Sequence, residues 1–449
     1  MFNFCDSVIL HQKKFCFLAF LILIFHFSDA ISAARTPSQA LPESFEREGQ
    51  RNIFRGKDGL VPDSKLKLKK LENIEVEVIP KTLIILAPEK LQNQIDFKKY
   101  EKEIVGKLTK INDLYTTAAL ITKEYKNAGF PLVRVVVPRQ ELNPEGATVF
   151  LKVIDGFVEK VDLSKVPVMQ TLLTFSYLKP LINKKSLKNE ELERQLILAG
   201  NSAGLSVKTA MLPGTKEGGT ILVVEGSHKS ISGNVSFDNT QSEELGRHLG
   251  QARISLNSSM GFGESITLFG LSRPTRKGMK GGGTDAPIRG GGVSVSVPLN
   301  SKGLSFNATY LESKTSPGEE VKSLGLEANM KSATFNFSYP LVLNSNKSWF
   351  LRGTINWADE IQHTSINGFD EDLSHDRLTS LRVGLSYNGC GRGCAGFNAE
   401  ISRGIEIASR SASEVGEGTP LSRASATSTY THMKVDTSYS IFPIENLLL

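Results

Sequence analysis

Apolar and polar residues alternate one by one in short segments from about Ile231 to the end of the chain. Side chains of a β-strand point to opposite faces with a period of two, so this pattern predicts strands with one apolar and one polar face. In one segment, for example, Phe397 and Ile401 share one face while Asn398 and Glu400 share the other. About ten such segments are present, which is typical of an outer-membrane β-barrel and also of a soluble β-sandwich.

The first residues of the chain favour the barrel. Lys13 and Lys14 precede the apolar run Phe15–Phe27, and small residues follow as far as Ala34. This layout predicts a secretory signal peptide over residues 1–34, with a buried helix as the alternative. The run is too short to span a bilayer. An exported chain would therefore enter a membrane through strands, and only a closed barrel satisfies the backbone of strands in lipid.

Three sections separate the predicted signal from the predicted barrel. Residues 35–71 are polar and rich in proline and lysine, and they read as a linker with room for one short helix. Residues 72–163 and then 164–228 each combine helical and strand patterns, which predicts two small α+β domains. The barrel part is expected over residues 229–449.

The two α+β domains share one order of features. In both, a helix is followed by a glycine, a strand that ends in proline, a glycine-containing turn, a second strand and an acidic residue before glycine. The last feature is Asp155-Gly156 in the first copy and Glu225-Gly226 in the second. The spacing of about 70 residues indicates a duplication.

Composition and motifs argue against enzyme chemistry. The formal net charge of +6 is mild for 449 residues, so no nucleic-acid partner is predicted. The chain has no phosphate-binding loop, no HExxH and no Gly-x-Ser-x-Gly. Acidic clusters such as Asp370–Asp372 fall in predicted loops, where solvation is the simpler explanation. We expect no catalytic residue, no cofactor and no metal site.

Two cysteines remain after removal of the predicted signal. Cys5 and Cys16 lie within it, whereas Cys390 and Cys394 would reach an oxidising compartment. A disulfide across a hairpin turn is therefore predicted. Two free thiols are the alternative, and a metal pair lacks a second pair of ligands nearby.

Several motifs follow one another in an order found in a known family. They are Ala128-Gly129-Phe130, Val153-Ile154-Asp155-Gly156, Leu192-Glu193-Arg194-Gln195-Leu196, Leu212-Pro213-Gly214, Phe237-Asp238-Asn239, Arg377-Leu378 and Ser402-Arg403-Gly404. From Ile74 onward the chain resembles the two-partner secretion transporters of the ShlB/FhaC/HecB group in the Omp85 superfamily. The first two motifs resemble a first polypeptide-transport-associated (POTRA) domain and the next two a second.

This resemblance implies a function, a location and partners. The function is an outer-membrane translocator that binds an unfolded exoprotein through periplasmic POTRA domains and secretes it through a barrel pore. The implied partners are a secreted TpsA-like exoprotein of the hemolysin or adhesin type, outer-membrane lipid, periplasmic chaperones and the barrel-assembly machinery. The alternatives are a barrel-assembly insertase and a passive porin or adhesin.

One strand of the first domain is a candidate for client binding. Pro131 and Pro138 flank the segment Leu132–Val137, and proline is best tolerated at a sheet edge because it cannot donate into a ladder. An edge can accept a strand from an unfolded client. The predicted client-binding residues are Leu132, Val133, Val135, Val137, Pro138 and Gln140. Valines that face the helices have the alternative role of core residues.

Charged residues on the polar faces of the later strands are candidates for lining a pore. The predicted set is Arg253, Arg352, Arg382, Lys434 and Asp436. Each one alone is equally compatible with a solvated charge at the rim, so the prediction concerns the set.

The resemblance also implies a barrel of 16 strands and a later loop with a Val/Leu-Arg-Gly-Phe/Tyr motif. The chain offers about ten strands before Leu449, and its nearest string, Leu351-Arg352-Gly353-Thr354, lacks the aromatic residue. The expected fold is therefore α+β POTRA domains followed by an antiparallel transmembrane β-barrel that is incomplete, with about ten of 16 strands.

Overall fold

The structure is a computed structural model that describes residues 77–441, apart from residues 144, 243, 244 and 246, segments 274–286 and 319–322, and residues 367, 392 and 417. The predicted signal peptide and linker, residues 1–71, lie outside the described residues. No helix in the described ranges is long and apolar enough to cross a membrane.

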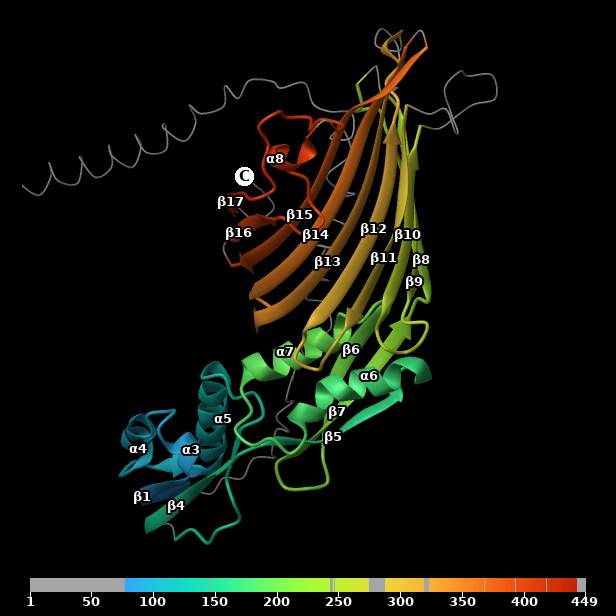
Figure 1. The fold of residues 1–449 in the computed structure, drawn as a ribbon. Helices are drawn as coiled ribbons and strands as arrows, with labels where there is room; N and C mark the ends of the chain where they lie inside the picture. Colours follow the sequence, from blue (N-terminus) through green and yellow to red (C-terminus); the bar gives the residue numbers. More distant parts are fainter. Residues whose placement is uncertain are drawn as a thin grey trace, which may run out of the picture.

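The first α+β unit is a four-stranded sheet covered by helices (Figure 1). Its elements are β1 (Glu77–Leu86), α3 (Glu89–Gln92), α4 (Lys98–Ile104), β2 (Thr109–Lys110), α5 (Ile111–Asn127), β3 (Arg134–Val136) and β4 (Glu145–Ile154). The strand order is β2-β1-β4-β3, with β1 parallel to β4. Leu114, Ile121 and Tyr125 share one face of α5 and are completely buried in the core of this unit.

The second α+β unit has a three-stranded sheet in the order β5-β7-β6. Its elements are β5 (Phe157–Lys165), α6 (Val168–Leu178), the 3₁₀ helix η3 (Lys179–Leu181), α7 (Asn189–Gly200), β6 (Leu205–Pro213) and β7 (Gly219–His228). The boundary expected at residue 163 is corrected by the pairing of β5, which runs parallel to β7. This strand therefore belongs to the second sheet.

The rest of the described chain forms one antiparallel sheet of ten strands in sequence order. The strands are β8 (Ile231–Asp238), β9 (Leu249–Asn257), β10 (Ser265–Ser272), β11 (Ile288–Pro298), β12 (Ser305–Thr315), β13 (Leu326–Leu343), β14 (Lys347–Ile366), β15 (Phe369–Cys390), β16 (Gly393–Ile405) and β17 (Thr431–Ile441), with the short helix α8 (Ala412–Val415) before the last. The predicted count of about ten strands is confirmed. Figure 1 shows them as a curved, tilted sheet.

The second unit packs against one end of this sheet, where the turns are short. Helix α7 lies beside β13, and Leu343 and Phe350 of the sheet join the apolar core of the second unit. The connection between β16 and β17 that carries α8 lies at the opposite end (Figure 1).

Candidate functional site

Small polar side chains form continuous rows across one face of the ten-stranded sheet. In the first row each residue stands directly opposite the next on the neighbouring strand. The row is Ser232, Ser255, Thr267, Ser294, Thr309, Thr334, Asn356 and Ser380. Hydroxyl oxygens are 2.8 Å apart between Ser255 and Thr267, and the amide of Asn356 donates to the Thr334 hydroxyl at 2.8 Å.

A second row runs beside the first, nearer the short turns. Its members are Asn257, Ser265, Ser296, Asn307, Asn336, Thr354, Arg382 and Ser402. The Asn336 amide donates to the Thr354 hydroxyl at 2.7 Å, and Asn307 reaches diagonally to Ser294 of the first row at 2.9 Å. The two rows form a hydrogen-bonded polar surface, which we call the polar face.

The opposite face of the same sheet is apolar and exposed. Its exposed residues include Ile254, Leu268, Phe335, Phe337, Leu351, Ile355, Leu381, Val383, Ile401, Met433 and Val435. An apolar surface of this extent is unusual for a protein in water. Apolar-out and polar-in alternation along tilted antiparallel strands is the arrangement of outer-membrane barrels.

All five predicted pore-lining residues project from the polar face. Arg352 donates to the Ser386 hydroxyl at 2.8 Å, and a guanidinium nitrogen of Arg382 lies 3.8 Å from a carboxylate oxygen of Glu400. Gly384 stands between Arg352 and Glu400 in the register and has no side chain to separate them. Their role in lining a pore stays a prediction.

The remaining members of that set lie farther apart. Lys434 is opposite Glu400, and its ammonium is 3.6 Å from the carboxylate of Asp436 on the same strand. Arg253 lies on β9, across from Phe269 and beside a small apolar cluster. The structure therefore groups four of the five with Glu400, which the alternation pattern does not distinguish from any other polar position.

The predicted client-binding strand is at a sheet edge, but its side chains face inward. Strand β3 is the edge of the first sheet, and Val133 and Val135 are buried in the core at 2% and 8% exposure. Leu132 is buried in the core of the second unit, and Val137 packs against the first. These side chains are core residues, which corrects the prediction that they contact a client directly.

The backbone of that edge is also engaged. The N–H of Val135 donates to the hydroxyl of Thr122 on α5 at 2.9 Å. Beyond Pro138, where β3 has ended, the side-chain amide of Gln140 donates to the carbonyl of Phe150 and accepts its N–H at 3.0 and 2.8 Å. Gln140 thus extends the edge of the sheet with its side chain and has a structural role in place of the predicted one.

Two adjacent residues of α7 fasten the second unit to the sheet. Glu193 is only 8% exposed and accepts the N–H of Ser345 in the β13–β14 turn at 3.0 Å. Arg194 donates to the carbonyls of Lys302 and Pro340 at 2.8 and 2.7 Å. These two residues belong to the motif Leu192–Leu196, whose sequence carries no signal for contacts more than 100 positions away.

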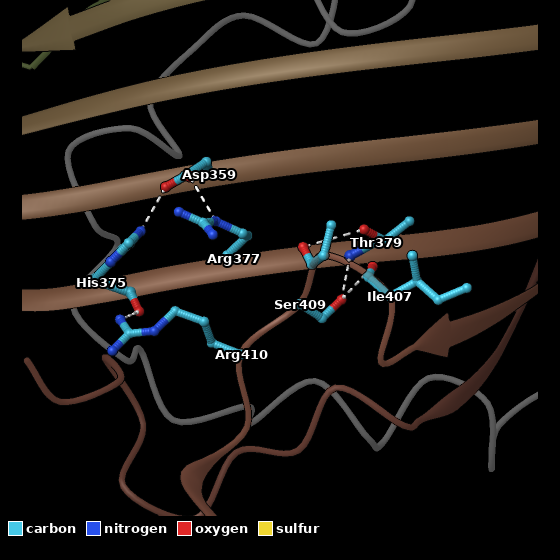
Figure 2. A network of polar contacts seen from close by, with 8 residues as sticks. Asp359, His375, Arg377, Thr379, Ile407, Ser409 and Arg410 are labelled. Atoms are coloured by element: carbon cyan, nitrogen blue, oxygen red, sulfur yellow. Dashed lines mark hydrogen bonds and ion pairs between the residues drawn. The ribbon is translucent and has the colours of Figure 1, made fainter. Parts of the chain in front are cut away.

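At the other end of the sheet, the connection 406–430 covers the part of β15 that extends beyond β16 (Figure 2). Arg410 donates its backbone N–H to the carbonyl of Arg377, and the N–H of Thr379 donates to the Ser409 hydroxyl at 2.8 Å. Asp359 accepts hydrogen bonds from His375 and Arg377, each at 2.7 Å. Among the described residues, the contacts from Ser409 and Arg410 satisfy backbone groups at the edge of β15, and Asp359 joins the side chains of β14 and β15.

The disulfide predicted between Cys390 and Cys394 is present in the structure, where it closes the β15–β16 turn. Within the described ranges, no cluster of three or more His, Cys, Asp or Glu side chains is arranged to hold a metal ion.

Comparisons with known proteins agree with this architecture. Residues 218–443 match the family "Haemolysin secretion/activation protein ShlB/FhaC/HecB", and residues 84–156 match "POTRA domain, ShlB-type". Among solved structures, CdiB from Escherichia coli has a TM-score of 0.61 at 16% identity over 92% of this chain and 73% of its own. CdiB from Acinetobacter baumannii has a TM-score of 0.56 at 16% identity over 92% and 75%.

Curated relatives match over shorter stretches. The hemolysin transporter protein ShlB of Serratia marcescens is 28% identical over 158 residues, which are 35% of this chain and 27% of ShlB. The heme/hemopexin transporter protein HuxB of Haemophilus influenzae is 25% identical over 173 residues, 38% of this chain and 30% of HuxB. The matched stretch thus spans less than a third of these relatives. Because the family match covers half of the chain, this protein belongs to the haemolysin secretion/activation family ShlB/FhaC/HecB.

Proposed function

We propose that this protein is an outer-membrane translocator of two-partner secretion, which binds an unfolded exoprotein through periplasmic POTRA domains and passes it along the polar face. The observation that carries the proposal is a single sheet with rows of Ser, Thr and Asn on one face and exposed apolar residues on the other. This sheet follows a POTRA domain in the chain.

The chemistry of the polar face suits an unfolded polypeptide. A peptide group transferred into hydrocarbon without a partner costs on the order of several kcal/mol. Hydroxyl and amide side chains both donate and accept hydrogen bonds, so they can serve backbone groups of any sequence. The cluster of Arg352, Arg382, Glu400 and Lys434 would add charges of both signs to the lining.

Relatives support a client of the hemolysin class, since two of them are named as hemolysin transporters and others as heme/hemopexin transporters. The second α+β unit is proposed as a second POTRA domain, over residues 164–228 with β5 added. Outer-membrane lipid, periplasmic chaperones and the barrel-assembly machinery complete the proposed partners. Transport would use no cofactor, and folding of the client outside the cell would supply the energy.

Since the outward N–H of Val135 on β3 already donates to Thr122, strand β6 is the better docking edge for a client. Strand β6 is the edge of the second sheet over nine residues, and in the described part of the chain its strand partner is β7 alone. At the two ends of the β6–β7 pairing, the N–H of Lys229 donates to the carbonyl of Gly204 and the N–H of Gly214 donates to the carbonyl of Gly219. The even-numbered residues of β6 are therefore the ones that exchange hydrogen bonds with β7. By the alternation of an antiparallel ladder, Ala210 points its N–H toward β7 and Met211 points its N–H away.

Two adjacent proline substitutions test this edge. Met211→Pro removes an N–H on the outer side, and Ala210→Pro removes one that bonds to β7. We expect the full-length protein with Met211→Pro to bind the denatured amino-terminal segment of a hemolysin-type exoprotein at least about tenfold more weakly, which is 1.4 kcal/mol. Fluorescence anisotropy measures the binding, and circular dichroism checks that the variant is folded.

The comparison with Ala210→Pro separates edge binding from loss of fold. This variant should unfold more easily while its folded fraction keeps the outer N–H. Equal binding by folded Met211→Pro and unmodified protein contradicts docking on β6. No binding by the unmodified protein contradicts the proposed function itself.

A further inference from the structure

Along the first two turns of helix α6, polar side chains are buried and apolar side chains are exposed. The helix carries no charged residue between Val168 and Leu178. Gln170 and Thr174 are buried at 2% and 0% exposure, whereas Val168 and Leu172 are exposed at 88% and 76%. A surface helix of a water-soluble protein normally buries its apolar stripe and exposes its polar one.

The polar side of α6 packs against the short turn between β9 and β10. The Gln170 amide donates to the carbonyl of Ser258 at 3.3 Å. A side chain at Gly261 would come within 2.7 Å of the Met169 carbonyl, so the turn touches the helix backbone. The fully buried apolar side chains of α6, Tyr177 and Leu178, lie in its last turn, and Leu173 packs against the same core of the second unit while partly exposed.

The outward side of α6 is a single apolar stripe. It consists of Val168, Met169, Leu172 and Phe175, at positions i, i+1, i+4 and i+7, and all four are exposed. Residues with this spacing share one face of a helix. We call these four residues the α6 stripe.

The α6 stripe continues the apolar face of the sheet. The β9–β10 turn that α6 touches exposes Met260 and Phe262 at 61% and 62%. Next to this turn, Ile231 and Leu256 stand opposite each other on β8 and β9, and both are exposed on the apolar face. Figure 1 shows α6 beneath the β9–β10 turn, lying across the direction of the strands.

We propose that the α6 stripe inserts into the lipid leaflet on the side of the short turns, so that α6 is an interfacial helix that holds the second unit against the membrane. The proposal rests on the proposed function in one respect, the placement of the apolar face in lipid. With the strands crossing the bilayer, a helix across them lies parallel to its surface. Helices in this position bury their apolar side at the boundary of headgroups and acyl chains.

Lipid is favoured over a client segment because the stripe is continuous with the apolar face and has no charged residue. A client-binding surface would have to work in water, where an exposed apolar stripe of this kind invites aggregation. Lipid contact removes the stripe from water permanently.

Site-specific photocrosslinking tests the assignment. Benzoylphenylalanine is placed at Leu172 in the α6 stripe, at Ile355 on the apolar face, or at Lys216 in the exposed β6–β7 turn of the second unit. The full-length protein in phospholipid vesicles is irradiated with unfolded exoprotein present, and adducts are identified by mass spectrometry. We expect phospholipid adducts at positions 172 and 355, severalfold above the yield at position 216.

The three positions distinguish the outcomes. Lipid adducts at 355 without lipid adducts at 172 overturn the proposal for α6 and leave the membrane placement of the sheet intact. Exoprotein adducts at 172 in place of lipid adducts also overturn it and make α6 a client-binding helix. Absence of lipid adducts at both 172 and 355 contradicts the membrane placement, and with it the proposed function. In a Leu172→Glu variant that keeps the native circular dichroism spectrum, a probe at Val168 should lose most of its lipid adduct.

Discussion

At the scale of single residues, the contacts of Glu159 on β5 explain the glycine in the motif Leu212-Pro213-Gly214. Its carboxylate accepts hydrogen bonds from the Thr215 hydroxyl, the Thr215 N–H and the Lys216 N–H. A side chain at Gly214 would come within 2.2 Å of that carboxylate. A Cβ at this position would also lie 2.7 Å from the carbonyl carbon of Gly219, so the glycine of Leu212-Pro213-Gly214 allows close approach both to Glu159 and to the backbone of Gly219.

These contacts make a prediction about pH. The hydrogen bonds, that of the Thr215 hydroxyl foremost, hold the pKa of the Glu159 carboxyl below its ordinary value of 4.5. A pKa lowered by folding stabilises the protein above the unfolded-state pKa, and this contribution is lost as pH falls through the folded-state pKa. Glu159→Gln should therefore lower the thermal unfolding midpoint at neutral pH, by an amount that shrinks below pH 4.5.

The matched control is Glu190→Gln, at an exposed position of α7. At neutral pH its unfolding midpoint should lie closer to that of the unmodified protein than the midpoint of Glu159→Gln does. A difference between Glu159→Gln and the unmodified protein that stays constant down to pH 3 would contradict the explanation.

At the scale of elements, α5 protects the edge of the first sheet. The hydroxyl of Thr122 accepts the N–H of Val135 and donates to the carbonyl of Ala118 at 2.8 Å. An edge strand with open backbone groups is a template for pairing with other chains. Here the Thr122 hydroxyl accepts a hydrogen bond from the outward N–H of Val135 on β3, a strand of three residues.

Replacing that hydroxyl should both destabilise the unit and open its edge. Thr122→Val leaves the Val135 N–H without its acceptor, which costs about 1–3 kcal/mol when the donor stays buried. Thr122→Ser keeps the hydroxyl and is the control. We expect a lower urea midpoint and greater self-association for the valine variant alone, measured by circular dichroism and light scattering. Equal behaviour of the two variants would mean that the hydroxyl does not protect the edge.

At the scale of the whole molecule, the position of the second unit depends on polar contacts at the short turns. Glu193 and Arg194 reach three different turns or strand ends of the sheet from one helical turn. Hydrogen bonds to charged groups contribute about 1.5–3 kcal/mol each. This pair fixes the second unit, and any client bound to it, relative to the polar face.

Removing the guanidinium should loosen this attachment without unfolding either part. In Arg194→Ala the carbonyls of Lys302 and Pro340 lose their donor. We expect faster hydrogen exchange in the β11–β12 and β13–β14 turns, with unchanged exchange in the first unit. Arg194→Lys, which cannot match the geometry of a guanidinium, should give an intermediate result. Unchanged exchange in the turns of Arg194→Ala would show that apolar packing of Leu343 and Phe350 is sufficient.

The sequence by itself determined what depends on local geometry. Strict alternation predicted about ten strands and assigned Arg352, Arg382, Lys434 and Asp436 to one face, because the side-chain period of a strand is two. The repeated glycine and proline positions revealed the two α+β units, because these residues restrict the backbone directly. The disulfide between Cys390 and Cys394 was predicted because they are the two cysteines that remain after the predicted signal peptide and an exported chain reaches an oxidising compartment.

The tertiary structure decided what depends on contacts between distant parts of the chain. Strand β5 looked like the end of the first unit, but its pairing with β7 places it in the second, since sheet pairing joins residues about 60 positions apart. Helix α6 was not predicted, because its exposed stripe and buried polar residues reverse the usual pattern. Three further features follow from register and packing, for which a single sequence carries no local signal. They are the hydrogen bond at the edge of β3, the contacts of Glu193 and Arg194, and the grouping of charges around Glu400.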